Sequence, residues 1–91
     1  MKTVRVEVTA ELIAAGIRKS CFECPLALAA MRALGGEFAY ITTKGCCVDF
    51  PEGSAPERVR FRLPELAVDF MRAFDGGHNV EPFSFEIEIP S

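Results

Sequence analysis

Residues 83–89 alternate between apolar and polar side chains more strictly than any other segment of the chain. Because successive side chains of a strand point to opposite faces, this period of two predicts a strand with one buried face. Residues 3–9 alternate in the same way, with Val4, Val6 and Val8 on the apolar side, and residues 58–63 do so again. The chain is therefore expected to fold around a sheet that is buried on one face and solvated on the other.

Other segments show helical spacing of their apolar residues. The first covers residues 25–34, with Pro25 in the first turn, where its missing N–H costs nothing. The second covers residues 64–75 and also opens on a proline. A shorter helical turn is predicted for residues 10–15, with Thr9 as its cap.

Residues 38–42 and 46–50 are predicted to be strands, and Lys44-Gly45 between them is a hairpin signal. The main elements thus follow the order β–α–β–β–β–α–β. This order predicts a single α+β domain over residues 1–91, with an antiparallel sheet of four to five strands and two helices on one face. A ferredoxin-like, split βαβ arrangement fits best, and it places the first strand at the centre of the sheet.

Charge and hydropathy argue against several classes of protein. Thirteen acidic residues outnumber ten basic ones, and the net charge of −3 has the wrong sign for general nucleic-acid binding. The longest apolar stretch, residues 25–31, is about a third of a membrane span. The first residues alternate instead of forming the apolar region of a secretory signal, so we expect a cytoplasmic protein with reduced thiols.

A C-x-x-C pair, Cys21 and Cys24, is the segment most suggestive of chemistry. Zinc accepts four thiolates, and Cys46-Cys47 would complete such a set. Neighbouring residues of a strand point to opposite faces, however, so Cys46 is expected inside and Cys47 outside. A site of three cysteines, Cys21, Cys24 and Cys46, completed by His78 is the remaining metal alternative.

The same C-x-x-C pair could be a redox dithiol, because a helix N-terminus lowers the pKa of a nearby thiol. A thioredoxin-like site places its cysteines directly after a strand, whereas here about a dozen residues, including a glycine, intervene. We favour a structural interpretation, in which the thiols pack the start of the helix against the sheet, as free cysteines commonly do. That interpretation calls for no metal and no other cofactor.

Arg58, Arg60 and Arg62 share the outward face of one predicted strand, and Arg5 could lie beside them. Such a stripe could bind phosphates or an acidic protein, which makes these arginines the candidate partner-binding residues. The favoured alternative is a cross-strand ladder of ion pairs with outward glutamates on neighbouring strands, namely Glu7, Glu86 and Glu88.

No other group of residues indicates catalysis. His78 follows a glycine pair in a predicted surface loop and could serve a cysteine nucleophile, but a single loop histidine is usually solvated. Glu86 and Glu88 lie on an exposed strand face without a pocket. Phe38 and Tyr40 share a strand face, which core packing explains better than a stacking platform for bases. We therefore expect a protein that is not an enzyme.

Two segments together resemble a group of small phage and bacterial proteins that carry no assigned function. They are S-C-F-E-C-P-L-A-L-A at 20–29 and F-M-R-A-F-D-G-G-H-N-V-E-P-F-S-F-E at 70–86. The resemblance implies a phage or prophage origin and a site of action in the host cytoplasm. It supplies no substrate, cofactor or catalytic residue.

These features predict a non-enzymatic protein-binding module, such as a phage accessory protein or an inhibitor of a host protein, for example one that counters host defence. Apolar residues make up 49% of the chain, which is high for a domain of this size, so part of that surface is expected at an interface with a partner protein or with a second copy in a homodimer. The alternative is a small zinc- or thiol-dependent protein that uses Cys21 and Cys24.

Overall fold

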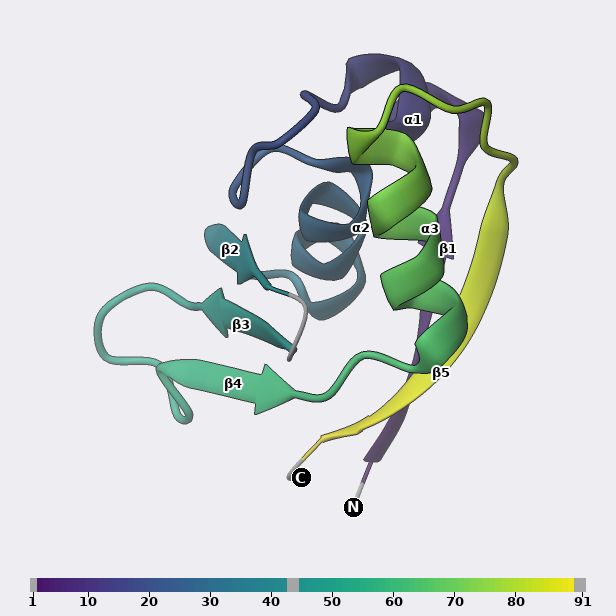
Figure 1. The fold of residues 1–91 in the computed structure, drawn as a ribbon. Helices are drawn as coiled ribbons and strands as arrows, with labels where there is room; N and C mark the ends of the chain where they lie inside the picture. Colours follow the sequence, from purple (N-terminus) through teal and green to yellow (C-terminus); the bar gives the residue numbers. More distant parts are fainter. Residues whose placement is uncertain (1, 43–44, 90–91) are drawn as a thin grey trace.

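The computed structural model describes residues 2–42 and 45–89. The elements in these ranges are β1 (Lys2–Val8), α1 (Ala10–Ala15), α2 (Pro25–Leu34), β2 (Phe38–Ile41), β3 (Cys46–Asp49), β4 (Arg58–Phe61), α3 (Glu65–Asp75) and β5 (Phe83–Ile89) (Figure 1). Their types and order confirm the predicted succession of helices and strands. Of the predicted hairpin turn, Lys44 lies outside the described residues, whereas the Gly45 carbonyl accepts a hydrogen bond from the Thr42 N–H at 2.9 Å.

The described strands form two antiparallel sheets instead of one. β1 pairs with β5 along its whole length, from Lys2 opposite Ile89 to Val8 opposite Phe83. In the second sheet, β3 lies between β2 and β4. The α+β class is therefore confirmed, but the predicted single ferredoxin-like sheet is wrong, and β1 does not lie at the centre of a larger sheet.

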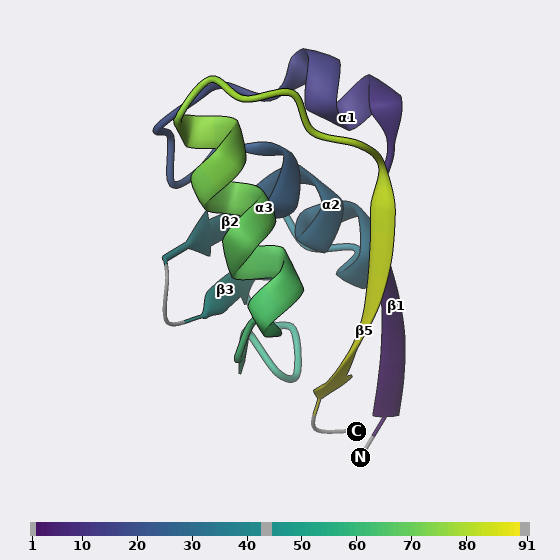
Figure 2. The ribbon, with the colours of Figure 1, turned by 45° about the vertical axis from the view of Figure 1, so that its right-hand side comes forward.

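Helix α2 lies between the two sheets and explains this difference (Figure 2). It contacts β1 of one sheet and both β2 and β3 of the other. At about 100° per residue, its buried positions spread over roughly 200° of the helix circumference; these positions are Pro25, Leu26, Ala27, Ala29 and Ala30. A helix that covers one face of a single sheet buries a narrower stripe, so α2 needs apolar partners on two sides.

Helix α3 buries one narrow stripe instead. Its buried residues recur at positions i, i+3, i+4 and i+7, namely Ala67, Phe70, Met71 and Phe74. The Phe70 ring packs against Phe83 of β5, with ring centroids 4.7 Å apart, and so anchors α3 to the β1–β5 sheet. None of the described helices is long and apolar enough to cross a membrane.

Buried apolar side chains of the described residues form one cluster between the two sheets. Val6 of β1, Leu26 of α2 and Val48 of β3 are at most 1% exposed. Alternation correctly predicted the inward side of most of the strands, as in β4, where Val59 is buried and Arg60 is exposed. Because the helices lie on the inner side of the β2–β3–β4 sheet, its other face is left open (Figure 1).

Candidate functional site

The open face of the β2–β3–β4 sheet carries its side chains in rows across the strands. The register places Phe38, Asp49 and Arg58 in one row and Tyr40, Cys47 and Arg60 in the next. We call this surface the outer face; it consists of Phe22, Phe38, Tyr40, Cys47, Asp49, Arg58, Arg60 and Arg62. Aromatic side chains thus line one side of it, and arginines line the other.

Phe22 reaches the outer face because the C-F-E-C turn is tied to the edge of β2. The Cys21 carbonyl accepts a hydrogen bond from the Ile41 N–H at 2.9 Å. Within the turn, the Ser20 hydroxyl oxygen accepts from the backbone N–H groups of Phe22 at 3.3 Å and Glu23 at 2.9 Å. These bonds hold the turn in one conformation and direct the phenyl ring over β2.

The three aromatic rings of the outer face form a cluster that remains largely accessible. The Phe22 ring centroid lies 4.9 Å from that of Phe38 and 5.1 Å from that of Tyr40. Phe22, Phe38 and Tyr40 are nevertheless 45%, 46% and 42% exposed. The predicted core packing of Phe38 and Tyr40 is therefore wrong; Ala39 and Ile41 point into the core instead.

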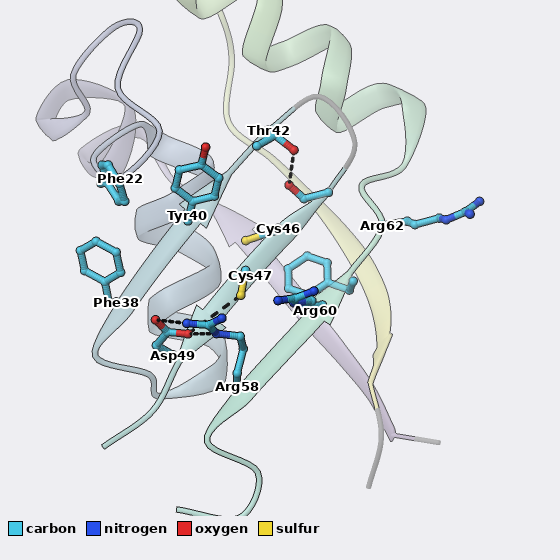
Figure 3. Close-up of a pocket in the computed structure, with 12 residues that line it drawn as sticks. Phe22, Phe38, Tyr40, Thr42, Cys46, Cys47, Asp49, Arg58, Arg60 and Arg62 are labelled. Carbon is cyan, nitrogen blue, oxygen red and sulfur yellow. Dashed lines mark hydrogen bonds and ion pairs between the residues drawn. The ribbon is translucent and has the colours of Figure 1, made fainter. Parts of the chain in front are cut away.

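An open groove of about 780 Å³ runs between the aromatic cluster and the arginines (Figure 3). Cys47 and Asp49 lie on β3 between its two sides, and Arg60 stands across from Tyr40 in the same row. Arg62 extends away from the sheet at the far rim. A concave surface with apolar and cationic sides can bind a ligand that has apolar and anionic parts.

Asp49 and Arg58 form an ion pair at one end of the groove. The guanidinium Nε lies 2.6 Å from Oδ1 and the second nitrogen, Nη2, lies 3.3 Å from Oδ2. The hydrogen bond from Arg58 lowers the pKa of the Asp49 carboxyl below its ordinary value. The Asp49 carboxylate thus largely compensates the charge of Arg58. Within residues 2–42 and 45–89, by contrast, no carboxylate forms an ion pair with Arg60 or Arg62.

The thiols divide between the core and the surface. Cys24 is buried and caps α2, because its Sγ accepts a hydrogen bond from the Ala27 N–H at 3.5 Å. Cys46 is buried beneath the groove, and burial raises the pKa of its thiol to about 12. Cys47 points to the other face, with its Sγ 3.9 Å from Asp49 Oδ1. The predicted opposite orientation of Cys46 and Cys47 is confirmed.

The residues of the metal alternative do not come together as a metal site in the described part of the chain. Cys21 is half-buried in its turn, Cys24 and Cys46 belong to the core, and His78 is exposed just after α3. Among the described residues, no group of three or more histidine, cysteine or acidic side chains could hold a metal ion. The C-x-x-C-P segment contributes a backbone carbonyl, a phenyl ring and a helix cap to the structure.

The expected ion-pair ladder between the arginine stripe and the glutamates is not formed. Glu7, Glu86 and Glu88 belong to the β1–β5 sheet, separate from β4. Arg5 also lies there, where its Nε is 3.4 Å from Glu7 and its Nη2 donates to the Ser84 hydroxyl at 3.1 Å. The ladder depended on the single-sheet topology and is wrong together with it.

Sequence reasoning missed the aromatic half of the outer face. The β2 segment, Phe-Ala-Tyr-Ile, is apolar on both faces, so its period of two could not say which face is exposed. One signal was present: Asp49 and Arg58 occupy the same side of the neighbouring strands, and charged side chains seldom face a core.

Comparison with known proteins found no matching family model, curated protein or solved structure.

Proposed function

We propose that the chain is a non-enzymatic protein-binding module and that the outer face is its binding surface. One observation carries the proposal: three aromatic side chains pack together, yet each leaves more than two fifths of its area exposed beside an open groove. Contiguous exposed apolar surface of this kind marks interaction sites, because a soluble domain gains nothing from leaving it in water.

The composition of the outer face supports the same function. Tyrosine, phenylalanine and arginine are the residue types enriched at protein interfaces, and Tyr40 and Arg60 face one another across the groove. Such residues contribute most of the binding free energy when a partner excludes water from them. The exposed rings of Phe22 and Phe38 extend this centre along the edge of β2.

The polar groups of the groove are arranged for recognition better than for catalysis. Asp49 is the acidic group nearest to Cys47, but Arg58 already binds both of its oxygens. A carboxylate held in this way is a poor base for activating a thiol, because the ion pair stabilises its charged form. In the setting that the sequence resemblance implies, the protein would be a phage accessory protein that binds, and thereby inhibits, a protein of the host cytoplasm.

The test is a selection of random twelve-residue peptides on the immobilised full chain, followed by affinity measurements on the peptides recovered. Because Tyr40 belongs to the aromatic cluster and faces Arg60 across the groove, Tyr40→Ala is expected to weaken their binding about tenfold or more. Leu66→Ala is the matched control, since Leu66 on α3 is a large apolar side chain that is even more exposed, at 51% against 42% for Tyr40. Isothermal titration calorimetry measures both affinities.

The proposal fails if the selection recovers no binding peptide, or if Tyr40→Ala and Leu66→Ala have the same effect. Circular dichroism and urea unfolding of both variants establish that they are folded. Both side chains are exposed, so neither truncation opens a cavity in the core.

A further inference from the structure

We infer that the outer face binds an extended protein segment in which acidic residues alternate with apolar ones. This inference rests on the proposed function and specifies the chemistry of the partner. Its starting point is that the two sides of the groove differ in character: the β2 side is aromatic and the β4 side is cationic. One ligand must therefore satisfy both sides at once.

Strand geometry gives the spacing that the ligand has to match. Adjacent strands lie about 4.8 Å apart, so the aromatic column on β2 and the arginine column on β4 are separated by roughly 10 Å. Arg60 is on β4 and Arg62 lies just beyond its end, two residues further on, which is about 6.8 Å along extended backbone. An extended segment lying lengthwise over β3 projects its side chains alternately to the two sides and repeats each side every 6.8 Å or so.

Such a segment would place apolar side chains against Phe38 and Tyr40 and carboxylates beside Arg60 and Arg62. The carboxylates belong on the arginine side because the two guanidiniums have no ion-pair partner in the described part of the chain. Planar guanidinium groups bind carboxylates through two parallel hydrogen bonds. Arg58 is excluded from this role by its bond to Asp49.

A second copy of the chain fits the outer face less well. The acidic side chain that a second copy would bring on the same surface is Asp49, which Arg58 already binds. The guanidinium groups of Arg60 and Arg62 from both copies would then face one another without compensating charge. Like charges brought together in this way oppose association.

Single-stranded nucleic acid also fits the groove less well. The Asp49 carboxylate lies within the groove, and the net charge of −3 repels a polyanion at long range. The Phe22 ring is tilted by 42° against Phe38 and by 59° against Tyr40, so the rings cover part of one another's faces. Base stacking requires aromatic faces that are open. The observations thus favour an acidic protein segment.

The peptides recovered by the selection described above provide the test. They are expected to carry aspartate or glutamate at positions i and i+2, with apolar residues between. Each peptide is compared with a counterpart in which asparagine or glutamine replaces the acidic residues. The chain should bind the acidic peptide about fivefold or more tightly than its amide counterpart, as expected for exposed ion pairs.

The double variant Arg60→Gln/Arg62→Gln should bind the acidic peptide and its amide counterpart with equal affinity. Arg5→Gln is the control, because Arg5 is an exposed arginine of the β1–β5 sheet, and it should keep the full preference. A peptide that needs Tyr40 but shows no preference for its acidic form overturns this inference and leaves the proposed function standing. Loss of all dependence on Tyr40 overturns the proposed function itself.

Two further measurements decide between classes of ligand. In the first, a ten-nucleotide oligo(dT) is titrated against the full chain. If it binds more tightly than the selected peptides, and the Arg60→Gln/Arg62→Gln variant loses this binding, the ligand is a nucleic acid and the inference of a protein segment is overturned. Sedimentation equilibrium of the free protein is the second measurement. A dimer that Tyr40→Ala converts to a monomer would show that a second copy occupies the outer face, and it would overturn the inference.

Discussion

Individual residues of the C-F-E-C-P segment have structural roles that differ from the metal or redox chemistry that the C-x-x-C spacing suggests. Cys21 acts through its backbone carbonyl, which accepts a hydrogen bond from Ile41 of β2. Phe22, between the two cysteines, supplies a ring of the outer face, and Cys24 caps α2 with its sulfur. The depth of each thiol in the fold, more than its distance from another cysteine in the sequence, decides its chemistry.

Cys46 makes the stability of the protein sensitive to alkaline pH. Its thiol has an ordinary pKa of 9.0, which burial raises to about 12 in the folded protein. Between these values the unfolded chain loses the Cys46 proton while the folded chain keeps it. The free energy of unfolding therefore falls as pH rises above about 9, with a contribution from Cys46 of up to about 1.4 kcal/mol per pH unit.

Urea unfolding at about pH 7 and about pH 10 measures this loss, and Cys46→Ala is expected to reduce it. Some alkaline loss should remain in the variant, because burial also raises the pKa of Cys24. Val48→Ala is the control: Val48 is a buried, non-titrating neighbour on β3, and its loss should lower stability equally at both pH values. An unchanged pH dependence in Cys46→Ala would contradict the prediction.

The connection between α2 and β2 contains a place where the chain packs too closely for any side chain. Gly35 ends α2 in the left-handed region, with φ +71°, and a Cβ there would meet no atom within 4 Å. Gly36 differs, because a Cβ on it would clash with the side chain of Val48 and approach the Asp49 carbonyl oxygen to 2.9 Å. Gly35 therefore serves to end the helix, whereas Gly36 is needed for the close approach of β3.

Gly36→Ala is expected to destabilise the protein by about 1–3 kcal/mol, because β3 must move to admit the methyl group. Gly35→Ala should cost about 1 kcal/mol, the strain of a left-handed alanine, without moving β3. Urea unfolding gives the two costs, and amide chemical shifts of Val48 and Asp49 report the movement. A Gly36→Ala variant as stable as the unmodified chain would show that β3 is free to adjust.

At the scale of the whole molecule, α2 holds the two sheets together. Ala27, Ala29 and Ala30 are at most 2% exposed, and their small side chains let the helix fit between β1 on one side and β2 and β3 on the other. The arrangement keeps the described helices away from the outer face, which therefore stays open. A single sheet with both helices on one face would have placed the same arginines beside glutamates.

Ala27→Leu tests this sandwiched position. Because Ala27 is fully buried, three extra carbon atoms have no space, and the free energy of unfolding is expected to fall by about 1–3 kcal/mol or more. Ala33→Leu is the matched control on the same helix, where the side chain is only half-buried and should cost much less. Urea unfolding of both variants measures the difference, and equal costs would contradict a tight fit of α2 between the sheets.

Local patterns in the sequence were sufficient for the elements and for the inward side of most strands. A period of two, a proline in the first turn and a glycine pair at a helix end each act within a few residues. The local structure that they favour therefore does not depend on how the elements are arranged in the fold. The opposite orientation of Cys46 and Cys47 follows from the same local geometry. The stripe of Arg58, Arg60 and Arg62 was visible for this reason as well.

Only the tertiary structure decided which strands pair and which apolar side chains stay in water. Pairing depends on contacts between residues far apart in the chain, such as Lys2 with Ile89, and alternation within a strand carries no information about its neighbour. Phe38 and Tyr40 became accessible because α2 packs against the opposite face of β2. The tie between Cys21 and Ile41 then brought Phe22 beside them and completed the outer face.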